Sequence, residues 1–159
     1  SFLSRSRCTF LISTIIFSFF FFFFFGGASD NAVSALGKLC DVHAERFPSS
    51  RAVLESHWLP RLPLTSDNEE SIAVTSHLCD MLEKPNRTQL VMGTSFESLG
   101  RILHIFCTVV TSDRRKGLCN KTLRGRITKL LQGMKSAVPA QVFQGAVAQL
   151  PSNMQQMFQ

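Results

Sequence analysis

From Asp30 to the C-terminus, apolar residues recur at alternating steps of three and four positions, the spacing that places them on one face of an α-helix. Proline-containing turns interrupt this pattern at Pro48, Pro60 and Pro85. No segment shows a convincing alternation of apolar and polar residues typical of a half-buried strand. The sequence therefore predicts an all-α fold of about seven helices.

Cap residues and prolines set the expected helix boundaries. The expected helices span residues 30–47, 51–59, 67–83, 96–110 and 119–134, with two short ones whose first residues are Pro139 and Pro151. Asp30 is the expected N-cap of the first helix, whose buried stripe is expected to reach His43 and Phe47. Thr94 and Glu97 have the spacing of a capping box. Helix starts recur roughly every 40 residues, but spacing alone leaves open a compact bundle or a stack of antiparallel helix pairs.

The first 29 residues form a separate, Phe-rich segment. Residues 10–25 carry no charge, follow Arg5 and Arg7, and precede Gly26 and Gly27. A hydropathy scan would flag residues 10–27 as a signal peptide or a short transmembrane helix. Seven consecutive Phe residues suit a helix poorly, and Phe codons are pyrimidine-rich, as is the end of an intron. We favour a translated intron for residues 1–29, with residues 30–159 as the folded region.

Cysteines, histidines and glycines provide no recognisable catalytic or metal-binding pattern. The five cysteines are widely separated and none forms a Cys-x-x-Cys pair, which argues against a zinc site and a disulfide framework and favours a reducing compartment. The four histidines lack a second ligand at a metal-binding step. Both glycine-rich nucleotide-binding motifs are absent. We expect a non-enzymatic protein without a cofactor or a metal.

Several short sequence segments between Asp30 and Pro85 resemble those of a known protein family. They are Asp30-Asn31-Ala32-Val33, Gly37-Lys38-Leu39-Cys40, His57-Trp58-Leu59-Pro60-Arg61-Leu62-Pro63-Leu64, the acids Asp67, Glu69 and Glu70, and Leu78-Cys79-Asp80. Together they resemble the C-terminal HEAT repeats of the importin-β (β-karyopherin) family of nuclear transport receptors, most closely its importin beta-3 branch. Ala148-Gln149-Leu150-Pro151 is similar to the terminal helices of that family.

This resemblance implies an α-solenoid of stacked antiparallel helix pairs, an armadillo-type fold, that binds cargo proteins for passage through the nuclear pore. It implies cargo that includes basic proteins such as ribosomal proteins or histones, and release of that cargo by the GTP form of Ran. It also implies a longer parent whose N-terminal repeats contact Ran and nucleoporins, and a location in the cytoplasm and nucleus.

Charge is divided between the two halves of the folded region. The chain has a net charge of +6, but residues 30–97 are acidic and residues 98–159 hold a single acid, Asp113. The candidate contacts to basic cargo are Asp67, Glu69, Glu70, Asp80 and Glu83. The candidate face for an acidic partner is Arg114, Arg115, Lys121, Arg124 and Lys129. Each set also fits an ordinary solvated helix surface.

Two other functions fit parts of the sequence. If residues 10–25 are a genuine apolar segment, the chain is a membrane-anchored or secreted helical protein, and the glycosylation sequons at Asn86 and Asn120 are available. The basic residues of 114–135 would also suit a nucleic-acid binder, although no aromatic residue is interleaved there for base stacking.

Overall fold

The computed structural model describes residues 30–112 and 117–159, so the expectations for residues 1–29, and for Arg114 and Arg115, lie outside it. Within the described ranges every regular element is helical and there is no strand, which confirms the all-α expectation. The α-helices are α2 (Asp30–Val42), α3 (Ser50–Val53), α4 (Asn68–Glu83), α5 (Pro85–Met92), α6 (Leu99–Thr111), α7 (Lys121–Ala137), α8 (Ala140–Ala148) and α9 (Ser152–Gln155). Helix α3 continues through a π turn, η1 (Leu54–Trp58), and a 3-10 turn, η2 (Leu59–Arg61), and α9 continues into η4 (Gln156–Phe158).

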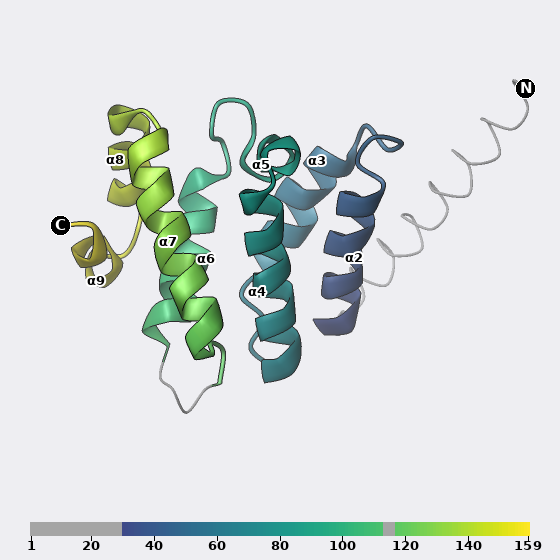
Figure 1. The fold of residues 1–159 in the computed structure, drawn as a ribbon, viewed down its shortest axis with the longest axis horizontal. Helices are drawn as coiled ribbons and strands as arrows, with labels where there is room; N and C mark the ends of the chain where they lie inside the picture. The colour runs from purple at the N-terminus through teal and green to yellow at the C-terminus, as the bar shows by residue number, and fades with distance from the viewer. Residues whose placement is uncertain (1–29, 113–116) are drawn as a thin grey trace, which may run out of the picture.

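The longer helices form two layers (Figure 1). Helices α2, α4 and α7 lie side by side in one layer, where α4 contacts both of its neighbours. Behind them lie α3 with its two turns, α6 and α8, and α6 contacts both η2 and α8. The chain alternates between the layers, and α5 is a short helix at one end of α4. A continuous hydrophobic core runs between the layers from Val33 to Met154.

Trp58 is the largest side chain that is fully buried in the described core. Its indole lies directly against α2 at Gly37, where a Cβ atom would approach the Trp58 ring to 2.5 Å. On its other side the ring meets the His77 imidazole of α4 edge-on, with the ring centres 6.2 Å apart. Gly37 is therefore needed for α2 to pack this closely against the tryptophan.

Arg101 of α6 binds the end of η2 within the rear layer. Its Nε donates a hydrogen bond to the carbonyl of Leu59 (3.0 Å) and its Nη2 donates to the carbonyl of Pro60 (2.9 Å). The last carbonyls of a helical segment lack partners within the helix. The Leu59 carbonyl also accepts from the Leu62 N–H at 3.2 Å, so Arg101 adds a second hydrogen bond there and fixes the turn that follows Trp58.

The first helix is shorter than the sequence pattern predicts. Helix α2 ends at Val42, His43 is exposed, and Phe47 is only half-buried. Asp30 is the first residue of the helix instead of its N-cap. Turns replace the helix after Val42, and the proline at position 48 disfavours helical geometry at Phe47.

The sequence pattern does not predict helix α5, because a proline such as Pro85 is also typical of the end of a helix. Lys84 is extended, with φ −94° and ψ 116°, which is the geometry preferred before proline. Pro85 then occupies the first position of a new helix, where its missing N–H costs nothing. The Thr88 hydroxyl donates to the carbonyls of Leu82 and Lys84, so it joins the end of α4 to α5.

Three smaller predictions were also wrong. The expected capping box does not form: α6 begins at Leu99, and the Glu97 carboxylate accepts a hydrogen bond from the Ser95 N–H. Pro139 and Pro151 are N-caps, one residue before the positions expected for them. Helix α7 begins at Lys121, two residues after the expected start, and ends at Ala137.

The contact between Gly37 and Trp58 gives a direct test of the packing. Gly37→Ala is expected to lower the free energy of unfolding by about 1–3 kcal/mol, because the added methyl must displace a buried ring. Gly125→Ala is the matched control: no atom lies within 4 Å of the added Cβ, and alanine is the better helix former by about 1 kcal/mol. Urea unfolding followed by circular dichroism measures both variants, and equal stabilities would contradict the packing described.

Candidate partner-binding surfaces

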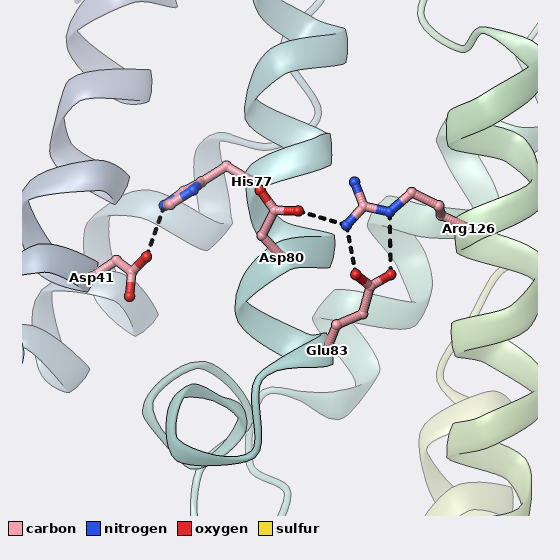
Figure 2. Close-up of polar contacts among 5 residues, drawn as sticks. All are labelled: Asp41, His77, Asp80, Glu83 and Arg126. Atoms are coloured by element: carbon pink, nitrogen blue, oxygen red, sulfur yellow. Dashed lines mark hydrogen bonds and ion pairs between the residues drawn. The ribbon is translucent and has the colours of Figure 1, made fainter.

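The seam between α4 and α7 is held by one arginine (Figure 2). The Arg126 Nη2 atom lies 2.6 Å from Oδ1 of Asp80 and 2.8 Å from Oε2 of Glu83. The Arg126 Nε also donates to Oε1 of Glu83 at 3.2 Å. Asp80 and Glu83 are three residues apart on α4, so they share a helix face. One guanidinium from α7 therefore binds both acids, Glu83 through two parallel hydrogen bonds.

These contacts change the local charge more than they stabilise the fold. Hydrogen bonds from the guanidinium to Glu83 and then to Asp80 raise the pKa of Arg126 above its usual value. Both carboxylates remain partly exposed, and ion pairs of this kind contribute about 0–1 kcal/mol. The arrangement thus fixes the α4–α7 register and neutralises part of the acidic surface at the end of α4.

A second set of ion pairs lies at the seam between α2, α4 and α5. The buried Asp41 of α2 accepts from Arg87 of α5, with Arg87 Nε 2.8 Å from Oδ1. The His77 Nε2 atom of α4 lies 3.8 Å from the other Asp41 oxygen (Figure 2). An isolated buried carboxylate would be costly, and Arg87 compensates that charge. The Arg87–Asp41 pair therefore joins α5 to α2 at this seam, whereas the His77 Nε2 atom makes no hydrogen bond there.

The five acids predicted to contact basic cargo lie at opposite ends of α4. Asp67 is the N-cap, and its carboxylate accepts from the N–H groups of Glu69 and Glu70 at 2.8 and 3.1 Å. Glu69 is exposed and Glu70 half-buried. Asp80 and Glu83 lie at the other end, about 20 Å away for a helix of this length. The acids therefore form two small groups, one of which is already bound by Arg126.

The predicted basic residues also differ in their surroundings. Lys121 and Lys129 of α7 are exposed. Arg124 instead donates to the Val110 carbonyl at 2.6 Å, at the C-terminal end of α6. Asn120 caps α7 by accepting from the Leu123 N–H at 2.8 Å. Part of this basic charge therefore holds helices together and is not free for a partner.

The thiols and histidines of the described ranges form no reactive cluster. Burial raises the pKa of Cys40 and Cys107 to about 11 and that of Cys79 to about 12. Within residues 30–112 and 117–159, no three His, Cys, Asp or Glu side chains are grouped so that they could hold a metal ion. In the same residues, no helix is both long enough and apolar enough to cross a membrane.

Comparisons with known proteins give no family assignment. No protein-family model matches the chain. No solved structure matches it at a significant level either.

Arg126→Met tests the α4–α7 bridge. The variant is expected to lose about 0.5–1 kcal/mol of unfolding free energy at low ionic strength, because two ion pairs disappear, and the loss should shrink in concentrated salt. Lys129→Met removes the same charge from an exposed position of α7 and should be close to neutral. Urea unfolding at two salt concentrations measures both, and equal behaviour of the two variants would argue against the bridge.

Cysteine labelling tests the burial of the thiols. Among the described cysteines, the half-buried Cys119 should react first with iodoacetamide, because Cys40, Cys79 and Cys107 are buried and their raised pKa values leave little thiolate. The three buried thiols should react at a comparable rate only in urea. Peptide mapping by mass spectrometry assigns each site, and rapid native labelling of Cys79 would contradict the packing of α4 against α7.

Proposed function

We propose that residues 30–159 form successive HEAT-like units of an α-solenoid, and that the protein acts as a cargo-binding part of a nuclear import receptor of the importin-β type. The observation that carries this proposal is the alternation of the chain between two helix layers, in which α4 contacts both α2 and α7. In a solenoid each helix pair buries its apolar face against the neighbouring pairs. Helix α4 follows that rule.

The residues that resemble the importin-β family support the same proposal by their positions. Gly37 lies against the Trp58 ring, where α2 packs on the rear layer. Leu59 and Pro60 provide the carbonyls that bind Arg101 of α6. Two of the family-like segments thus lie where helices pack closely together, and close packing tolerates little change of side-chain volume.

The proposed activity is binding, not catalysis. The acidic excess of residues 30–97 suits basic cargo such as ribosomal proteins or histones through electrostatic complementarity. Such a receptor works in the cytoplasm and the nucleus and needs no cofactor. Ran and nucleoporins would engage the parent receptor through other repeats.

Binding to purified core histones tests the proposal. The full chain, immobilised on a biosensor, should bind core histones at moderate ionic strength and bind an acidic protein such as serum albumin far more weakly. The chain's own net charge of +6 makes this test demanding, because non-specific attraction would favour the acidic protein. Preference for albumin, or no histone binding at low salt, would refute the proposed cargo class.

A further inference from the structure

An open groove of about 610 Å³ lies where the turn after α2, helix α3 with η1, helix α5 and the loop before α6 meet. Its volume is within the range of known binding sites. The charged side chains that line it come from all four of these segments, and Leu90 adds apolar surface. None of the acids predicted from the sequence to contact cargo is part of this lining.

Arg51 organises one wall of this groove. Its Nη1 donates to the Val91 carbonyl at 3.1 Å and to the Ser98 hydroxyl at 3.0 Å. Its Nη2 lies 3.4 Å from the Glu55 carboxylate and 3.5 Å from that of Glu97. The guanidinium is thus fixed by neutral oxygens on one side and orients two carboxylates on the other.

The loop from 93 to 98 brings Glu97 to this wall. Gly93 has φ +87°, and a Cβ there would overlap the Glu97 carboxylate, so this position requires glycine. Backbone hydrogen bonds, first from the Glu97 N–H and then from that of Ser95, lower the pKa of Glu97, and Arg51 lowers it further. The carboxylate stays ionised at neutral pH.

The groove has an excess of negative charge. The positive charge of Arg87 is compensated by Asp41, buried behind it at 2.8 Å. Glu45, Glu55 and Glu97 are 85%, 49% and 45% exposed. Glu55 and Glu97 pair with Arg51, and Glu45 lies 4.0 Å from Arg87. Together with Asp41, four carboxylates therefore face two guanidinium groups, which leaves a net negative charge. A bound ligand would meet net negative charge, which favours a cation.

We propose that this groove binds an extended polypeptide segment rich in lysine or arginine. The carboxylates of Glu45, Glu55 and Glu97 pair with its cationic groups, and Leu90 packs against the methylene stems of those side chains. Gln89 offers an amide that both donates and accepts hydrogen bonds with an extended backbone. The inference rests on the proposed function and names the surface that receives the basic partner.

A labelled peptide of alternating lysine and glycine tests the groove by fluorescence anisotropy with the full chain. The double variant Glu45→Gln, Glu55→Gln is expected to bind it about five- to tenfold more weakly, since each lost pair removes a modest ion-pair energy. The comparison variant Glu69→Gln, Glu70→Gln makes the same charge change outside the groove, at two of the acids predicted from the sequence to contact cargo. It therefore shows which of the two acidic sites binds the peptide. Circular dichroism and urea unfolding confirm that both variants are folded.

Each outcome decides the proposal. A selective loss in the groove variant, with no binding of a glutamate–glycine peptide, supports it. Equal affinities of the groove variant and the original chain, equal losses in both variants, or no binding of the lysine peptide at low salt would overturn it. If core histones still bind the groove variant normally, the proposed function survives and the groove is wrong. If histones do not bind the unaltered chain, the proposed function itself has failed.

Discussion

The contact between Gly37 and Trp58 constrains the packing of the first helices. The fully buried Trp58 ring lies against α2, and it can approach this closely only because α2 has no side chain at position 37. This contact sets how closely α2 approaches the rear layer. The position of α2 in turn places Asp41 within reach of His77 and Arg87. Apolar packing thus determines which polar groups can meet at the seam.

Arginines connect the helices wherever the hydrophobic core ends. Arg101 and Arg124 donate to backbone carbonyls of neighbouring elements, while Arg87 and Arg126 bind carboxylates across the seams of the front layer. A planar guanidinium with several donors can satisfy two acceptors at once. The number of basic residues in the C-terminal half is therefore larger than the positive charge that its surface exposes. Some of these residues are used in contacts inside the molecule.

The helical spacing in the sequence was sufficient to predict the all-α fold. It was not sufficient for α5, because Pro85 is compatible both with the end of one helix and with the first turn of the next. It also could not reveal the bridge from Arg126 to Asp80, which lie 46 positions apart. A contact of that kind depends on which helices become neighbours, and local periodicity contains no such information.

The same distinction applies to the acidic surface. Acids that are close in the sequence, such as Asp67, Glu69 and Glu70, cap a helix, and those at the other end of α4 bind Arg126. Glu45, Glu55 and Glu97 are far apart in the sequence, yet the fold brings them around one groove. A helical scaffold forms its binding surfaces from the ends and loops of several helices. Local sequence spacing could not group Glu45, Glu55 and Glu97, because the three carboxylates come from separate elements.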